Sequence, residues 1–145
     1  MNRTECVVVS GGFDPIHIGH LRMFKEASEL ASKLIVIVNN DNFLTKKKGY
    51  VFMPIEERLE IIESCGVVDM VVESIDKDLT VCETLQWLAK EENVKIFANG
   101  GDNKNTDAIP EADVCRKNKI AMKFNIGGGK IQSSSSLVAK ETIKA

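Results

Sequence analysis

The sequence lacks the features that mark secreted, membrane-spanning and zinc-binding proteins. Its four cysteines form no C-x-x-C pair and no cluster with zinc spacing, so we interpret them as small apolar residues in a reducing compartment. The longest strongly apolar run, Leu34 to Val38, is far too short to span a bilayer. The first residues, Met1 to Glu5, lack the apolar stretch of a signal peptide. These absences predict a cytoplasmic protein without a membrane segment.

An excess of positive charge is also missing. The formal net charge is −2, so no global positive field favours nucleic acid as a partner. Hydrophobic residues make up 43% of the chain and charged residues 28%, which is ordinary for a globular protein. The length of 145 residues is sufficient for one domain with a sizeable core, and we assign residues 1–145 to a single domain.

Apolar runs that predict strands alternate with amphipathic stretches that predict helices. Strands are expected near Cys6–Val9, Leu34–Val38, Asp69–Glu73, Lys95–Ala98 and Ile120–Phe124. Helices are expected from about His20 to Ser32, from Pro54 to Gly66, from a capping box at Thr80–Glu83, from Pro110, and from the serine run Ser133–Ser136. The lysine-rich segment Asn39–Tyr50 is expected to be a loop. This alternation predicts an α/β protein with a Rossmann-like, doubly wound, five-stranded parallel sheet in one domain.

The segment from Gly11 to His20 joins the first strand to the first helix. It contains two glycines, an Asp-Pro pair and a His-x-Gly-His pattern. A parallel sheet presents backbone N–H groups to a bound anion at such a junction. His17 and His20 are the only histidines in the chain, and both can donate hydrogen bonds to phosphate oxygens. A polyphosphate is therefore the expected ligand; for a zinc site, no nearby cysteine or acidic residue completes the ligand set.

Three later segments leave the same edge of the predicted sheet. Lys46, Lys47 and Lys48 follow the second strand, where a lysine can reach bound phosphates or form a solvated surface patch. Gly100, Gly101 and Asp102 follow the fourth strand, where glycines permit close approach to a nucleotide and a carboxylate can accept from a ribose hydroxyl. The serine run opens the last helix, whose N–H groups and hydroxyls suit an anion or a simple N-cap.

The pattern G-x-F-D-x-x-H-x-G-H resembles that of the cytidylyltransferase-like nucleotidyltransferases, and the resemblance extends over nearly the whole chain. Within that superfamily the chain is most similar to glycerol-3-phosphate cytidylyltransferases and to the adenylyltransferase domain of ADP-heptose synthases. The resemblance implies catalytic roles for His17, His20, Lys46 and Lys48. It implies nucleotide binding by Gly11, Gly12, Phe13, Gly19, Gly100, Asp102, Ser133, Ser134 and Ser135. It implies that Asp14, Asp41 and Arg58 contact the acceptor, with Asp41 near the acceptor or the metal.

The same resemblance implies transfer of a nucleoside monophosphate from CTP or ATP to a small phosphorylated polyol or sugar, with release of pyrophosphate. Mg²⁺ is expected to accompany the nucleoside triphosphate rather than to occupy a site built by the protein. A homodimer is expected by analogy. The sequence departs from the glycerol-3-phosphate enzymes in one place, because glycines and Lys130 stand where those enzymes have an arginine before the serine run.

Other functions remain open at this point. Pantetheine-phosphate and nicotinamide-mononucleotide adenylyltransferases carry a similar first loop and a similar serine-rich helix start. A nucleotide sensor without catalytic activity is an alternative of a different class. A fragment of a class I aminoacyl-tRNA synthetase is disfavoured, because the chain has no K-M-S-K-S loop.

Overall fold

The computed structural model describes residues 4–100, 109–124 and 126. In chain order the elements are β1 (Glu5–Gly11), α1 (Ile18–Ser28), β2 (Lys33–Val38), α2 (Asp41–Lys48), α3 (Ile55–Glu63), β3 (Met70–Glu73), α4 (Cys82–Glu91), β4 (Asn93–Ala98), α5 (Ala112–Lys117) and β5 (Ala121–Lys123). The strands form one sheet in the order β3-β2-β1-β4-β5, and every neighbouring pair is parallel. The predicted fold class, a doubly wound five-stranded parallel sheet, is confirmed.

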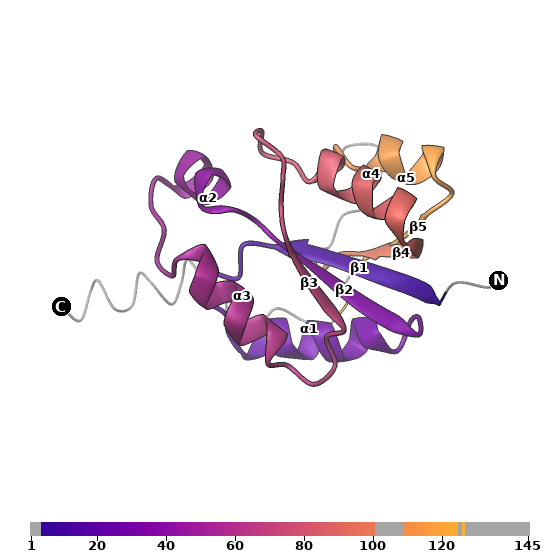
Figure 1. Cartoon of the computed structure of the whole chain (residues 1–145), viewed down its shortest axis with the longest axis horizontal. Helices are drawn as coiled ribbons and strands as arrows, with labels where there is room; N and C mark the ends of the chain where they lie inside the picture. The colour runs from indigo at the N-terminus through magenta and orange to yellow at the C-terminus, as the bar shows by residue number, and fades with distance from the viewer. Residues whose placement is uncertain (1–3, 101–108, 125, 127–145) are drawn as a thin grey trace.

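Helices cover both faces of the sheet (Figure 1), with α1 and α3 on one side and α4 and α5 on the other. Alternation along β1 explains the two layers, because successive side chains of a strand point to opposite faces. Val7 and Val9 pack with Phe24 of α1, whereas Cys6 and Val8 pack with Leu85 of α4. Both faces of β1 and β2 are therefore buried, which explains their unbroken apolar sequences.

The segment predicted as a loop, Asn39–Tyr50, contains a helix instead. The side chain of Asn40 accepts a hydrogen bond from the Phe43 N–H and caps the first turn of α2. Gly49 adopts a left-handed conformation with φ of 85° and ends the helix. Phe43 and Leu44 are the buried residues of α2. Capping and tertiary packing therefore stabilise a helix in a segment whose polar composition predicted a loop.

The boundaries of three helices also differ from the prediction. The N-terminus of α4 is capped by the buried carboxylate of Asp76, which accepts from the N–H groups of Glu83 and Thr84, so the predicted capping box at Thr80 is not formed. α1 begins at Ile18 because His17 is its N-cap, and it ends at Ser28 rather than Ser32. α3 begins after Pro54 as predicted but ends at Glu63, before Gly66. The helix predicted from Ser133 lies outside the described residues.

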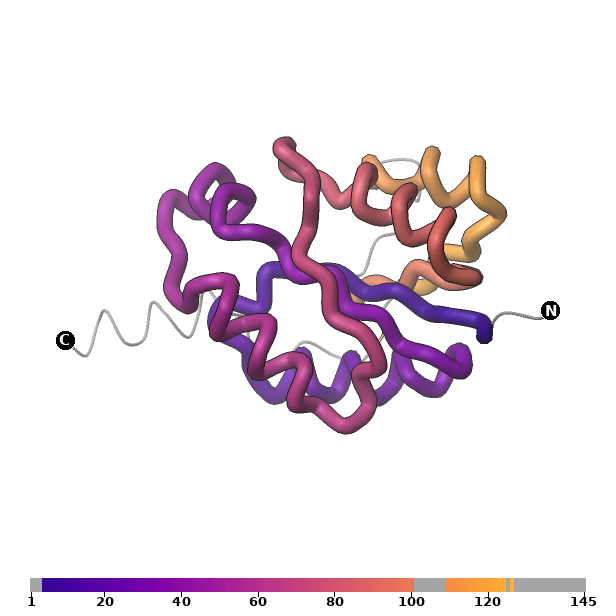
Figure 2. Tube along the Cα trace, viewed as in Figure 1, coloured from indigo at the N-terminus to yellow at the C-terminus, as the bar shows by residue number. Residues whose placement is uncertain are grey.

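The order of the strands places a topological switch point at the carboxyl ends of β1 and β4. The chain leaves β1 toward β2 on one side and reaches β4 on the other, and α/β proteins bind ligands at such a switch point. The loop after β1 also meets the segment between α2 and α3, which runs beside it (Figure 2). No helix in the described part of the chain is long and apolar enough to cross a membrane.

Candidate active site

The loop after β1 is shaped by Phe13, a non-glycine residue with a positive φ of 51°. Its ring is 3% exposed and folds back over Gly11, where a Cβ atom would lie 2.9 Å from the tip of the ring. The ring also packs edge-on against the imidazole of His20 and against Phe24. Phe13 therefore holds the loop against α1 through its ring contacts with His20 and Phe24. Its contact with a nucleotide stays a prediction.

The two histidines lie against each other at the start of α1. Their ring centroids are 3.8 Å apart and the ring planes differ by 27°. His17 Nδ1 accepts a hydrogen bond from the Gly19 N–H, and His20 Nδ1 accepts one from the His17 N–H, each at 3.1 Å. This reciprocal arrangement is a capping box built from imidazoles.

The capping bonds also determine where each ring carries its proton. A nitrogen that accepts a hydrogen bond holds no proton, so the neutral form of both rings is protonated at Nε2. Each ring then offers Nε2–H as a donor, while Nδ1 fixes the direction of the ring. The structure thus brings the two predicted phosphate donors together and orients them through the same backbone bonds that begin the helix.

Gly19 is needed because the ring of His17 lies over it. A Cβ atom at this position would be 2.9 Å from His17 Cε1 and 3.0 Å from His17 Nδ1. Gly12 is similarly close to Leu44 Cδ2, at 3.0 Å, and Gly100 is close to Met23 Sδ, at 3.0 Å. These three predicted nucleotide-binding glycines are therefore explained by packing in this structure, and their contacts with a nucleotide stay predictions.

Asp14, predicted to contact the acceptor, is instead buried behind the loop with 1% exposure. Its carboxylate accepts from the N–H groups of Phe52 and Met53, at 2.8 and 2.5 Å, and forms an ion pair with Lys48 at 3.2 Å. Every one of these partners comes from the segment after β2. Asp14 therefore joins two segments of the site, and its contact with an acceptor stays a prediction.

Arg58, also predicted to contact the acceptor, has a fully buried side chain. Its guanidinium donates to the carbonyl oxygens of Met53, Gly12 and Asn39, and to the carboxylate of Asp41 at 2.5 Å. The side chain of Asp41 is 42% exposed. Of this pair, Asp41 is the residue placed to reach a ligand, and Arg58 holds it at the N-terminus of α2.

The two lysines predicted to bind phosphate lie on different sides of α2. Lys48 Nζ contacts the carboxylate and the carbonyl oxygen of Asp14, next to the loop after β1. Lys46 Nζ donates at 2.7 Å to the carbonyl of Lys77, which lies in the loop after β3. Two positions apart on a helix do not share a face. Of the two, Lys48 is the one that contacts the histidine loop.

Asn39 is a residue that the sequence reasoning missed. Its Oδ1 is the only buried side-chain polar atom without a hydrogen-bond partner in the described part of the structure, and the residue is 7% exposed. It directly follows β2, and its N–H donates to the Gly11 carbonyl. A polar residue immediately after a buried strand was the available signal. A buried acceptor at this edge suits a hydroxyl or amino group of a ligand.

The remaining predicted residues are not part of the described structure. Asp102, Ser133, Ser134, Ser135 and Lys130 lie outside the described residues. Among residues 4–100, 109–124 and 126, no three histidine, cysteine, aspartate or glutamate side chains gather into a metal site.

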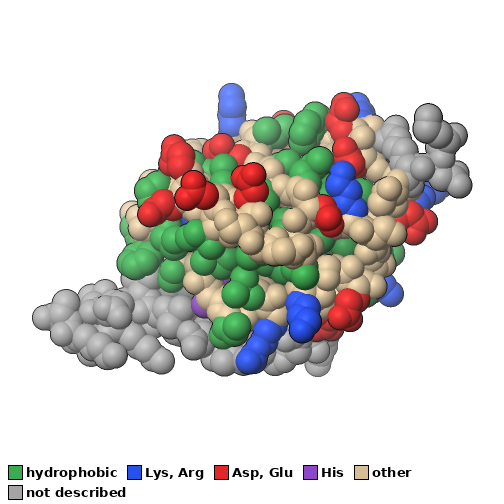
Figure 3. All heavy atoms as spheres, turned by 60° about the horizontal axis from the view of Figure 1, so that its bottom comes forward, with side chains coloured by type: hydrophobic (Ala, Val, Ile, Leu, Met, Phe, Trp, Pro, Cys, Tyr) green, Lys and Arg blue, Asp and Glu red, His purple; other side chains and the backbone are tan. Residues whose placement is uncertain are grey.

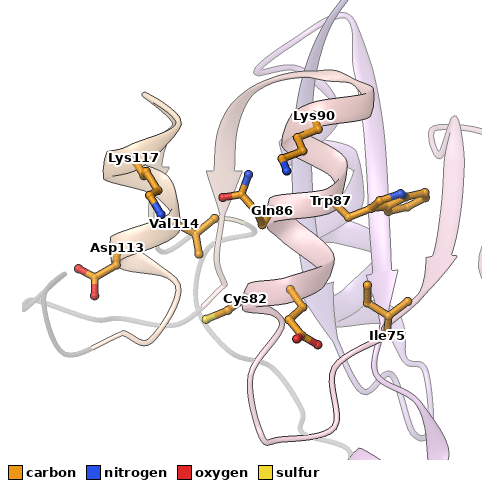
Figure 4. A pocket seen from close by; sticks show the side chains of 9 residues that line it. Ile75, Cys82, Gln86, Trp87, Lys90, Asp113, Val114 and Lys117 are labelled. Carbon is orange, nitrogen blue, oxygen red and sulfur yellow. The ribbon is translucent and has the colours of Figure 1, made fainter.

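Two other surfaces of the described structure differ from this site. The face of α1 and α3 carries acidic, basic and hydrophobic side chains together, with no continuous basic patch on its described part (Figure 3). An open groove lies between α4 and α5 (Figure 4) and is lined by Ile75, Cys82, Glu83, Gln86, Trp87, Lys90, Asp113, Val114 and Lys117. The groove contains none of the predicted site residues, so the candidate active site is the histidine loop at the switch point of the sheet.

The residues of this site lie within a stretch of the chain that matches a known protein family. The cytidylyltransferase-like family model matches residues 8–139. The chain belongs to this family.

Two groups of relatives stand out. An FAD synthase of Pyrococcus abyssi is 44% identical over 72 residues, which are 49% of this chain and 49% of that protein. The bifunctional protein HldE of Vibrio atlanticus is 33% identical over 112 residues, which are 76% of this chain and 22% of that protein. The alignments thus span about half of the FAD synthase and about a fifth of HldE.

Solved structures share the fold. A lipopolysaccharide core biosynthesis protein from Thermoplasma volcanium superposes with a TM-score of 0.65 at 22% identity, covering 83% of this chain and 95% of that one. A Vibrio parahaemolyticus protein assigned as a nicotinate-nucleotide adenylyltransferase superposes with a TM-score of 0.62 at 12% identity. At these identities the likeness concerns the fold alone.

Proposed function

We propose that this enzyme transfers a nucleoside monophosphate from ATP or CTP to a small phosphorylated polyol or sugar and releases pyrophosphate. The observation that carries the proposal is the stacked pair of imidazoles, His17 and His20, with both Nδ1 atoms bound to backbone N–H groups. Two donors fixed in this way at the switch point of a parallel sheet suit the α-phosphate of a nucleotide.

In the proposed reaction a phosphate oxygen of the acceptor attacks the α-phosphorus. A new P–O bond forms, the bond from the α-phosphorus to the bridging oxygen breaks, and pyrophosphate takes the electron pair. The second pKa of a phosphate monoester is about 6, so the attacking group is largely dianionic at neutral pH and needs no general base. Catalysis then consists of aligning two anions and stabilising charge on the equatorial oxygens.

We assign a separate role in this reaction to each group of side chains. His17 and His20 donate to the α-phosphate through Nε2–H, and Lys48 and Lys46 are proposed to hold the β- and γ-phosphates. The exposed carboxylate of Asp41, fixed by Arg58, can accept from a hydroxyl of the acceptor. Mg²⁺ would neutralise charge on the triphosphate, bound mainly through phosphate oxygens and water, and the exposed carboxylate of Asp41 could contribute an oxygen ligand.

A phosphate monoester with a flat aromatic group is a second candidate acceptor. Tyr50 and Phe52 are 38% and 50% exposed. They follow Lys48 in the chain, and the Lys48 Nζ lies 4.8 Å from the centre of the Tyr50 ring. Exposed aromatic side chains beside a cation suit a planar ring with an attached phosphate. The FAD synthases among the relatives form a product that joins an adenylate to a flavin, which also favours ATP as the donor.

A substrate panel tests the proposal. ATP, CTP, GTP and UTP are each combined with glycerol 3-phosphate, sugar 1-phosphates, nicotinamide mononucleotide, phosphopantetheine and flavin mononucleotide, and pyrophosphate release is measured. We expect turnover with ATP or CTP and one class of phosphorylated acceptor. Binding of a triphosphate without pyrophosphate release from any pair would support the nucleotide sensor instead. Sedimentation of the same preparation tests the expected homodimer.

A further inference from the structure

Asp14 is a buried carboxylate to which the proposed reaction gives no task. It is 1% exposed, and burying an unpaired charge is costly unless hydrogen bonds compensate. Its two oxygens have three internal partners, namely the N–H groups of Phe52 and Met53 and the ammonium of Lys48. The carboxylate is thus satisfied without any substrate.

Lys48 is the partner that reaches the surface. Its ammonium contacts both the carbonyl oxygen and Oδ2 of Asp14, at 3.0 and 3.2 Å, and lies 4.8 Å from the centre of the Tyr50 ring. An ammonium has three N–H donors. Asp14 takes two of them, and the side chain of Lys48 is 17% exposed, so the third donor is available at the surface of the site.

The neighbouring lysines show that this arrangement is specific. Lys47 is exposed, with its ammonium 5.7 Å from the centre of the Phe43 ring, and Lys46 contacts the loop after β3. Of the three consecutive lysines, Lys48 is therefore the one fixed against the histidine loop. The ion pair with the Asp14 carboxylate holds the Lys48 side chain in this position.

We propose that Asp14 is a positioning residue that holds the Lys48 ammonium where it contacts the triphosphate, and that Asp14 itself touches neither substrate. The inference rests on the proposed function. A free lysine loses rotamer freedom when it binds a phosphate, whereas Lys48 is already ordered by Asp14 and Tyr50. Asp14 acts through Lys48, so removing either residue removes the same interaction.

A double-mutant cycle tests this dependence. Asp14→Asn, Lys48→Met and the double variant are compared in kcat and in KM for the triphosphate, with Lys47→Met as the matched control. We expect each single variant to lower kcat/KM by about 10²-fold, mainly through KM for the triphosphate, and the double variant to match Lys48→Met. We expect Lys47→Met to behave as the unmodified protein. Losses that multiply in the double variant would overturn the proposal.

A measurement on the unmodified protein covers the case in which Asp14→Asn does not fold. The side-chain resonances of Asp14 and Lys48 are followed by NMR while a non-hydrolysable ATP or CTP analogue, or the acceptor alone, is added. We expect the Lys48 Nζ resonance to move with the triphosphate and the Asp14 carboxyl carbon to stay unchanged with the acceptor. A shift of Asp14 on adding acceptor would show direct contact and refute the positioning role.

The two proposals fail in different ways. If no substrate pair releases pyrophosphate, the proposed function is wrong, while the titration with the triphosphate analogue still tests whether Asp14 acts through Lys48. If the enzyme turns over and Asp14→Asn keeps the kcat/KM of the unmodified protein, only the positioning role is wrong.

Discussion

Asp14 and Arg58 hold the two sides of the Met53 backbone. The Met53 N–H donates to Asp14 Oδ1 at 2.5 Å, and the Met53 carbonyl accepts from Arg58 Nε at 2.8 Å. Arg58 also donates to the carbonyls of Gly12 and Asn39 at the ends of β1 and β2. The buried side chains of Asp14 and Arg58 therefore link the segment between α2 and α3, through hydrogen bonds, to the edge of the sheet where the site lies.

Arg58→Met is expected to lower the free energy of unfolding by at least about 3 kcal/mol, because three carbonyl oxygens and the Asp41 carboxylate lose a charged donor together. Urea unfolding followed by circular dichroism measures the change. Arg116→Met is the control, because its ion pair with Asp113 is exposed and is expected to contribute less than about 1 kcal/mol. Equal losses in the two variants would contradict this role of Arg58.

His17→Asn separates capping from catalysis. Asparagine is a good N-cap, so the start of α1 is expected to persist, whereas the imidazole donor is lost. We expect turnover, measured as pyrophosphate release, to fall by roughly 10²–10³-fold with little change in thermal unfolding. His17→Ala is expected to lose about 1 kcal/mol of stability as well. Near-normal turnover of His17→Asn would show that the imidazole is only a cap.

Gly19→Ala is expected to displace the ring of His17, since the added Cβ would lie 2.9 Å from its Cε1. A displacement of about 1 Å in an aligned site can cost roughly 10²-fold in rate. The measurement is kcat together with the imidazole resonances of His17 in the free protein. Gly66→Ala is the control, because nothing lies within 4 Å of a Cβ at that position. Unchanged kcat in Gly19→Ala would show that the ring position is not critical.

Asn39→Leu tests whether the unpartnered Oδ1 serves a ligand. Leucine has nearly the same shape, and replacing an unsatisfied buried acceptor with an apolar group is expected to leave stability unchanged or raise it. We expect weaker substrate binding, seen as a rise in KM with unfolding unaffected. A variant that is both less stable and fully active would show that Asn39 has a structural role alone.

The cysteines give an expected dependence of stability on pH. Burial raises the pKa of Cys115 from 9.0 to about 11. Between these values the unfolded chain releases a proton that the folded protein retains, so the free energy of unfolding falls as pH rises from about 9 to 11. Cys115→Ala is expected to remove this contribution in urea unfolding at several pH values. Below pH 9 the native thiol is expected to react slowly with alkylating reagents.

β1 and β2 were predictable because they are buried on both faces, which leaves continuous apolar runs in the sequence. α2 was missed because its stability depends on the packing of Phe43 and Leu44, while its lysines suggested a solvated loop. The cap of α4 was assigned to Thr80 because the local pattern matched, but Asp76, seven and eight residues before its partners Glu83 and Thr84, provides it. Local signals succeed where the contacts are local.

The same distinction applies to the candidate site. The sequence by itself placed His17 and His20 together, because both imidazoles lie in one turn at a junction that follows from the strand and helix patterns. Only the tertiary structure decided that Asp14 and Arg58 face inward, that Lys48 rather than Lys46 meets the histidine loop, and that Asn39 Oδ1 is unpartnered among the described residues. Those outcomes depend on contacts between segments 17 to 46 residues apart in the chain, which no local pattern encodes.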